Sequence, residues 1–175
     1  NALAKLIFGL ENFSGKLAMT FPRTVGQVPV YYNKHQSARV GNGSWSGLYQ
    51  DIESSPMYWF GHGLSYTTFK YDDLSVDEPN MIASVKITNT GNRLGKETVL
   101  WYVSDPEASI TQPIKKLKHF EKIELKPNES KVVVFEIDKT SHLSYVDQNG
   151  NIIFEPGDFK VNVGSLIKSF NISED

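Results

Sequence analysis

The sequence predicts a mainly β fold, an antiparallel β-sandwich, over residues 67–175. Short apolar runs recur from Phe69 onward with turn signals between them, which is typical of a sandwich. The expected strands number seven or more in about 105 residues, the size of an immunoglobulin-like domain. Alternation within the strands puts one face of each inward, so that two sheets can share a core.

Two of the expected strands are the most informative. Residues 82–89 alternate, with Ala83, Val85 and Ile87 on one face and polar side chains on the other. Residues 96–103 are apolar on both faces, so we expect them to form a central strand. The first strand is expected to end at 74–76, and the others lie at 114–125, 132–137, 143–146, 152–154, 159–163 and 169–172.

Turn chemistry separates these runs. Residues 89–92 favour a turn with a positive φ at Gly91 or Asn92. Residues 126–129 form another turn, in which Asn128 can adopt the left-handed conformation. Further turns are expected at 147–150 and 155–158.

Residues 1–66 are organised differently. The apolar spacing near the start predicts the end of a helix over 2–8, stopped by Gly9, and residues 16–21 predict a short strand ended by Pro22. Residues 22–66 are rich in aromatics and sustain no periodicity, so we expect a long ordered loop packed over another surface. The chain begins abruptly and without the features of a signal peptide, which suggests a start inside a larger domain.

Bulk composition excludes several classes of function. The net charge of −2 gives no strong attraction to nucleic acid, and no apolar run approaches the roughly 20 residues of a membrane helix. We therefore expect neither a nucleic-acid partner nor a membrane span. Cysteine is absent, which excludes disulfides and thiolate metal sites and leaves the compartment open.

Motifs spread along the chain resemble glycoside hydrolase family 3, the β-glucosidase and β-xylosidase group. Residues 15–33 (GKLAMTFPRTVGQVPVYYN) resemble the segment that closes the family's second, α/β sandwich domain, and residues 58–69 (YWFGHGLSYTTF) resemble its bridge into the third domain. Three further stretches resemble the family's fibronectin type III-like domain; they are 85–91 (VKITNTG), 117–123 (LKHFEKI) and 154–164 (FEPGDFKVNVG).

The resemblance implies a division into two parts. Residues 1–66 would be the C-terminal remnant of the α/β domain with an aromatic-rich linker, and residues 67–175 the fibronectin type III-like sandwich. The partners implied are the N-terminal catalytic domains of the same protein and an oligo- or disaccharide substrate. A periplasmic or secreted location is expected for the parent protein, and no cofactor is expected.

The resemblance also implies retaining hydrolysis by two carboxylates. The family's nucleophile is an Asp on an N-terminal barrel, and its acid/base Glu lies earlier in the α/β domain than these residues. No Glu of this chain matches that motif. We therefore expect no catalytic residue in this chain, and a sandwich that buttresses the catalytic domains of the parent.

Four residues are candidates for contact with the substrate, namely Lys34, His35, Arg39 and Trp45. By the resemblance, the loop that holds the first three could reach the rim of the active site, although its residues differ from the family's commoner basic, Gly-containing version. Trp45, like Trp59, has the shape to stack on a sugar ring. The alternative for the aromatics of 31–66 is that they pack the domain junction, since buried aromatics contribute large apolar areas.

Other reactive side chains carry weaker signals. Asp51 and Glu53 could form a carboxylate pair near a sugar, but isolated acidic pairs are common on surfaces. The four histidines lack the spacing of a metal motif, and we expect no metal site. His62, between two glycines, is expected to lie in a tight turn at the domain junction.

Two alternatives to a glycosidase portion remain from the sequence. The chain could be a stand-alone carbohydrate-binding or adhesion module, although its assignable outward positions are small or polar; these are Ser84, Lys86, Thr88, Lys160 and Asn162. It could also be a spacer or protein-interaction domain, with an apolar surface on residues 22–66 that a partner covers.

Overall fold

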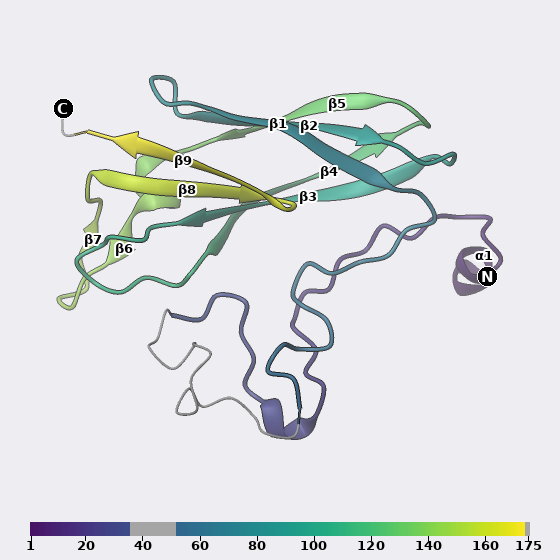
Figure 1. Ribbon diagram of the computed structural model, residues 1–175, viewed down its shortest axis with the longest axis horizontal. Coiled ribbons are helices and arrows are strands. Elements are labelled where there is room, and N and C mark those ends of the chain that lie inside the picture. Colours follow the sequence, from purple (N-terminus) through teal and green to yellow (C-terminus); the bar gives the residue numbers. More distant parts are fainter. Residues whose placement is uncertain (36–51, 174–175) are drawn as a thin grey trace.

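The computed structural model describes residues 1–35 and 52–173; residues 36–51 and 174–175 lie outside that description. Two antiparallel sheets face each other in a sandwich (Figure 1). One has the strand order β1-β2-β5 and the other β4-β3-β8-β9, with a small β6-β7 hairpin at one end. The strands are β1 (Phe69–Asp77), β2 (Ile82–Asn89), β3 (Gly95–Ser104), β4 (Lys116–Leu125), β5 (Ser130–Glu136), β6 (Tyr145–Val146), β7 (Ile152–Ile153), β8 (Gly157–Val163) and β9 (Leu166–Ile172).

The core lies between the two sheets, as the alternation predicts. Ala83, Val85 and Ile87 on β2 are fully buried, and so are the inward side chains of β3 and β8. β3 pairs with β4 along one edge and with β8 along the other, which confirms its prediction as a central strand. The predicted β-sandwich is therefore confirmed.

The turns are partly as predicted. Asn128 has φ 64°, the left-handed conformation expected of it. The chain turns between β2 and β3 as predicted, but the expected positive φ is wrong, since neither Gly91 nor Asn92 has a left-handed φ. Glycine is required at 91 for a different reason, because a Cβ there would collide with the hydroxyl of Thr67.

Two strands begin later than predicted, because the residues expected at their start form other contacts. β4 begins at Lys116 rather than at Ile114, whose amide donates to Lys34 O instead. The predicted strand 143–146 is shortened to β6, because a π-helical turn, η2 (Lys139–Leu143), precedes it. The carboxylate of Asp138 caps that turn by accepting from the amide of Ser141 at 2.7 Å.

The N-terminal part is irregular. The helix α1 (Ala2–Ile7) ends as predicted before Gly9, which has φ 71°, and none of its residues is buried. A 3₁₀ turn, η1 (Val25–Gln27), follows. The predicted strand 16–21 is wrong: only an isolated bridge joins Phe21 to Tyr58. The opposite segment folds into a turn at 59–62, and a continuous ladder cannot form across it.

Candidate functional site

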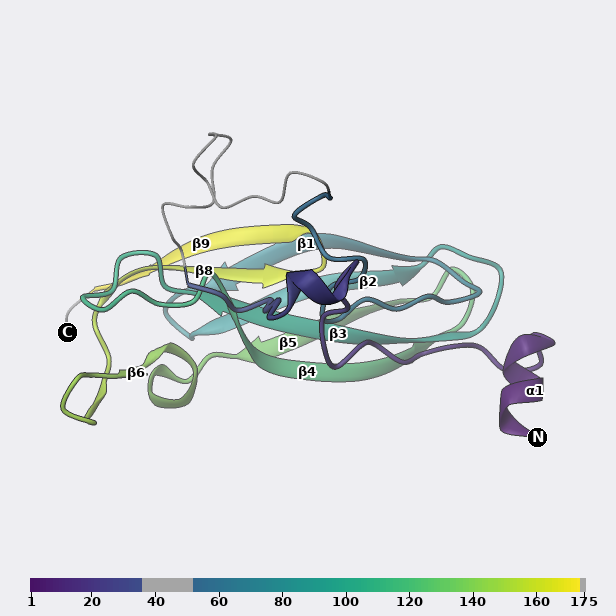
Figure 2. The ribbon, with the colours of Figure 1, turned by 90° about the horizontal axis from the view of Figure 1, so that it is seen from below.

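The N-terminal segments lie across the outer face of the β4-β3-β8-β9 sheet (Figure 2). We call this contact the junction, formed by residues 12–35 and 52–66 against β3, β4 and the loop 105–115. At one end Thr98 donates its hydroxyl hydrogen to Ser14 O at 3.4 Å, and at the other the amide of Leu117 donates to the hydroxyl of Tyr32 at 3.3 Å. Polar contacts therefore fix the junction at Thr98 on β3 and at Leu117 on β4, the partner of Tyr102.

Aromatic rings fill the middle of the junction. Tyr32 stacks on Phe60, with ring centroids 4.3 Å apart, and meets Tyr102 edge-on at 5.8 Å. Burial, with the neighbouring Tyr32, raises the pKa of Tyr102 to about 12, so its hydroxyl stays neutral. The ammonium of Lys115 lies 4.6 Å from the centroid of the Tyr102 ring, within cation–π range.

The backbone of residues 59–63 comes unusually close to β3. A Cβ at Gly61, which has φ 82°, would lie 2.8 Å from Cδ1 of Leu100 and 3.1 Å from the hydroxyl of Tyr102. His62 lies in the turn that its amide closes on Trp59 O at 3.0 Å, and its ring is 4.8 Å from that of Tyr58. The histidine is therefore part of the tight turn, as predicted.

Hydrogen bonds to the side chains of Asn12 and Asn89 fix the chain where the sandwich begins. Oδ1 of Asn12 accepts from the Ser65 hydroxyl at 3.1 Å and from the Tyr66 amide at 2.8 Å. The hydroxyl of Thr67 donates to the fully buried Asn89 at 2.7 Å. These bonds hold the chain where it passes from the irregular part into β1.

Two of the four candidate substrate residues are described, and the structure brings both to the junction. His35 forms an isolated bridge with Pro113, and Lys34 O accepts from the amide of Ile114 at 2.9 Å. Both side chains are exposed. Arg39 and Trp45 lie outside the described residues.

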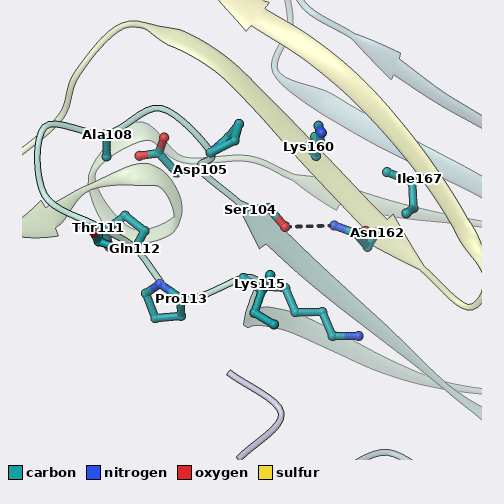
Figure 3. A pocket seen from close by; sticks show the side chains of 12 residues that line it. Ser104, Asp105, Ala108, Thr111, Gln112, Pro113, Lys115, Lys160, Asn162 and Ile167 are labelled. Atoms are coloured by element: carbon teal, nitrogen blue, oxygen red, sulfur yellow. Dashed lines mark hydrogen bonds between the residues drawn. The ribbon is translucent and has the colours of Figure 1, made fainter. Parts of the chain in front are cut away.

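A cavity of about 690 Å³ adjoins this bridge. Figure 3 shows its wall, built from the end of β3, the following loop and the outward side chains of β8 and β9. Asn162 donates to the hydroxyl of Ser104 at 3.3 Å across the sheet. Burial raises the pKa of Asp105 and lowers that of Lys115.

The cavity is polar, with one carboxylate among its described lining residues. Among the described residues that line it, Asp105 is the only carboxylate, whereas retaining and inverting glycosidases use a pair. Its polar lining can exchange hydrogen bonds with a ligand. Within residues 1–35 and 52–173, no group of three or more His, Asp or Glu side chains is placed to hold a metal ion.

The other candidate residues have structural partners where they are described. Glu53 forms an ion pair with Arg23 at 2.6 Å and accepts from the hydroxyl of Ser55, and Asp51 lies outside the description. His119 stacks on Phe135 at 5.4 Å, and the ring of His142 lies 4.9 Å from the same phenyl ring. These histidines pack against the sandwich core rather than forming a ligand cluster.

The junction roles of Tyr102 and Lys115 are not among those predicted from the sequence. The apolar outer face of 96–103 was a usable signal, because a side chain such as Leu100 on that face requires something to cover it. The cover comes from residues distant in the sequence, and their positions depend on the tertiary fold.

Comparisons with known proteins match this architecture. The model of the glycosyl hydrolase family 3 C-terminal domain matches residues 1–66, and that of the fibronectin type III-like domain matches residues 97–166. The chain belongs to glycoside hydrolase family 3. The resemblance of its motifs to this family is thereby confirmed.

Similar proteins in the family carry glycosidase names. The chain is 44% identical over 174 residues to a periplasmic β-glucosidase of Salmonella typhimurium, covering 94% of this chain and 23% of that protein. It is 42% identical over 175 residues to a β-xylosidase of Formosa agariphila, covering 97% of this chain and 24% of that protein. The chain thus spans about a quarter of the length of these relatives.

Solved structures agree with the sequence comparisons. A β-glucosidase from Erythrobacter marinus superposes with a TM-score of 0.86 at 36% identity, covering 98% of this chain and 23% of that one. A β-glucosidase from Listeria innocua gives a TM-score of 0.84 at 36% identity, covering 97% and 25%. In the part of this chain that the structure describes, no helix is long and apolar enough to cross a membrane.

Proposed function

We propose that this chain is the non-catalytic C-terminal portion of a β-glycosidase that hydrolyses terminal β-linked sugars by a retaining two-carboxylate mechanism. The observation that carries the proposal is the order of two matches, the family 3 C-terminal domain at 1–66 and the fibronectin type III-like domain at 97–166. The relatives that match nearly the whole chain are named β-glucosidase and β-xylosidase.

The catalytic carboxylates belong, in this proposal, to other domains of the parent protein. The described acidic residues nearest the junction support this. Glu53 is held by Arg23 and Ser55, and Glu97 by Lys16. Asp105 is the one carboxylate among the described residues that line its cavity.

The sandwich, residues 67–175, buttresses the α/β domain to which residues 1–66 belong. One side of the N-terminal part packs on β3 and β4, while many of its apolar side chains have no cover. Those that are more than 60% exposed are Leu3, Ile7, Phe8, Leu10, Met19, Val25, Val28, Tyr31 and Leu64. Apolar surface of this extent fits the remaining elements of the α/β domain as its partner.

Lys34, His35, Arg39 and Trp45 contact the sugar at the rim of the active site in this proposal. The support is the anchoring of residues 34 and 35 by their backbones to Pro113 and Ile114, which leaves both side chains exposed. We place the parent protein in the periplasm or outside the cell, because a relative with 44% identity is named as periplasmic.

The test is hydrolysis of a panel of p-nitrophenyl β-glycosides by this chain alone and by the same chain with its upstream sequence restored. We expect release of p-nitrophenol only by the restored protein. Hydrolysis by this chain alone would place the catalytic carboxylates within it and overturn the proposal. Inactivity of both proteins would contradict the assignment to a glycosidase.

A further inference from the structure

A groove of about 450 Å³ lies at the junction, separate from the cavity beside Asp105. β8 pairs with β3 only over Trp101–Ser104, so the preceding part of β3 has no strand on that side. Gly164, in the turn between β8 and β9, lies against the ring of Tyr71 on this side of the groove. Residues 57–62 form the opposite wall, and the volume is in the range of small-molecule sites.

The wall that residues 57–62 supply is aromatic and partly exposed. Trp59 has 45% of its surface accessible, and Tyr58 is exposed to a similar extent. The backbone bonds of the turn at 59–62 and the pairing of Phe21 with Tyr58 fix the backbone that carries both rings. Exposed aromatic faces on a fixed backbone can stack on a ligand without first becoming ordered.

The groove also contains a prepared hydrogen-bond acceptor. The side chain of Glu97 is only 10% exposed, and its Oε1 lies 2.8 Å from the hydroxyl of Tyr71 and 2.9 Å from Nζ of Lys16. Burial, together with Glu97, raises the pKa of Tyr71 well above its ordinary value, so this phenol remains a donor. Among the described residues, the second carboxylate oxygen of Glu97 has no hydrogen-bond or ion-pair partner.

The charged side chains of the groove supply hydrogen-bonding groups of both kinds. Lys16 is paired with Glu97, and Lys115 also lines the groove, so a carboxylate acceptor and ammonium donors are both present. Stacking faces beside a free carboxylate oxygen and two ammonium donors suit a neutral ring with hydroxyl groups on its edge and C–H bonds on its face.

We propose that this groove is a carbohydrate-binding site that takes a neutral pyranose oligosaccharide. A sugar ring lies against the indole of Trp59, and one of its hydroxyls donates to the free oxygen of Glu97. The site binds and does no chemistry, and it is distinct from the proposed contacts at Lys34 and His35, which do not line it. The residues of the groove support this site independently of the proposed hydrolysis.

The test is a titration of the 175-residue chain with cellobiose and cellotetraose, followed by saturation-transfer NMR and calorimetry. We expect saturable binding that weakens about tenfold in Trp59→Ala, because a stacking face is lost. Glu97→Gln should also weaken binding, since a charged acceptor becomes a neutral one. Phe120→Ala is the matched control; Phe120 is 64% exposed on β4 and does not line the groove.

Circular dichroism checks that each variant is folded. The proposal is overturned if neither sugar saturates the chain, or if Trp59→Ala and Glu97→Gln bind as the unaltered chain does. Binding that disappears when the upstream sequence is restored would assign the groove to a domain interface instead. If the restored protein hydrolyses glycosides but the groove binds no sugar, this site alone is rejected. If the groove binds sugar but the restored protein hydrolyses no glycoside, the proposed function alone is rejected.

Discussion

The sandwich and the N-terminal part of this chain are stabilised in different ways. The sandwich encloses its own core between two sheets, with residues such as Val85 and Val161 fully buried. In its described residues, 1–35 and 52–66, the N-terminal part has a helix without a buried residue and few regular backbone pairs. One region folds around its own apolar surface, and the other gains order by lying on β3 and β4. Four predictions, from the largest effect to the smallest, test this difference.

The largest effect is expected in the core. Trp101 is 0% exposed and lies 5.7 Å from Phe135 between ring centroids, so Trp101→Ala should lower the free energy of unfolding by about 3–5 kcal/mol. Phe8→Ala removes an aromatic ring that is 81% exposed, so the free energy of unfolding should change by about 0.5 kcal/mol or less. Urea unfolding measures both, and equal losses would contradict the comparison.

A smaller loss is expected where the linker crosses the sandwich. Gly91→Ala would force a Cβ against Thr67 and should cost about 1–3 kcal/mol. Gly15→Ala is the matched control, because an added Cβ there meets nothing within 4 Å. Thermal unfolding compares the two variants. A Gly91→Ala protein as stable as the control would show that the linker is not held closely.

The aromatic stack at the junction should matter only to the docked segments. Tyr32→Ala removes contacts with Phe60 and Tyr102, each worth about 0.5–1.5 kcal/mol. We expect faster proteolysis of residues 12–35, with the unfolding midpoint of the sandwich nearly unchanged. Tyr31→Ala, an exposed neighbour outside the stack, should be cleaved at the original rate. Equal rates for both variants would mean that the stack does not hold the segment.

The smallest effect is a pH dependence at η2. Burial, then the charge of Lys118, lowers the pKa of His142 below 6.5, and Nδ1 of His142 accepts from the Asp138 amide at 2.8 Å. A lowered folded-state pKa means that the unfolded chain binds more protons. The stabilisation is therefore complete above pH 6.5 and is lost as the pH falls from there toward the folded-state value.

Urea unfolding between pH 7.5 and 5 measures this effect, as the difference between the unaltered chain and His142→Asn. Asparagine supplies an uncharged acceptor near the position of Nδ1. As the pH falls from 7.5 to 5, the free energy of unfolding of the variant should rise relative to that of the unaltered chain, by less than about 1 kcal/mol. A change that favours the unaltered chain at low pH would contradict the sign.

The sequence predicts most of the sandwich because each strand carries its own signal. Alternation alone identifies residues 82–89, and two apolar faces identify 96–103 as central. The irregular part could not be predicted in the same way. The conformation of residues 16–21 depends on Tyr58 and the turn after it. Gly91 is needed because of Thr67, which lies in the segment before β1.

The candidate site shows the same limit. The family motifs pointed to the loop that contains Lys34 and His35, and the structure places both beside Pro113. Trp59 has a shape that suits stacking on a sugar ring, but no local pattern links it to Glu97. The two residues lie almost 40 positions apart in sequence and line one groove only through the packing of the junction.

Hydrogen exchange of this chain, read by mass spectrometry, tests the central claim most directly. The claim is that the N-terminal part is ordered by lying on β3 and β4. We predict slow exchange at the core strands and intermediate protection at three other amides. Those of Leu17 and Gly61 donate within the N-terminal part, and that of Ile114 donates across the junction to Lys34 O. Exchange of residues 12–35 and 52–66 at the rate of an unfolded chain would contradict the account.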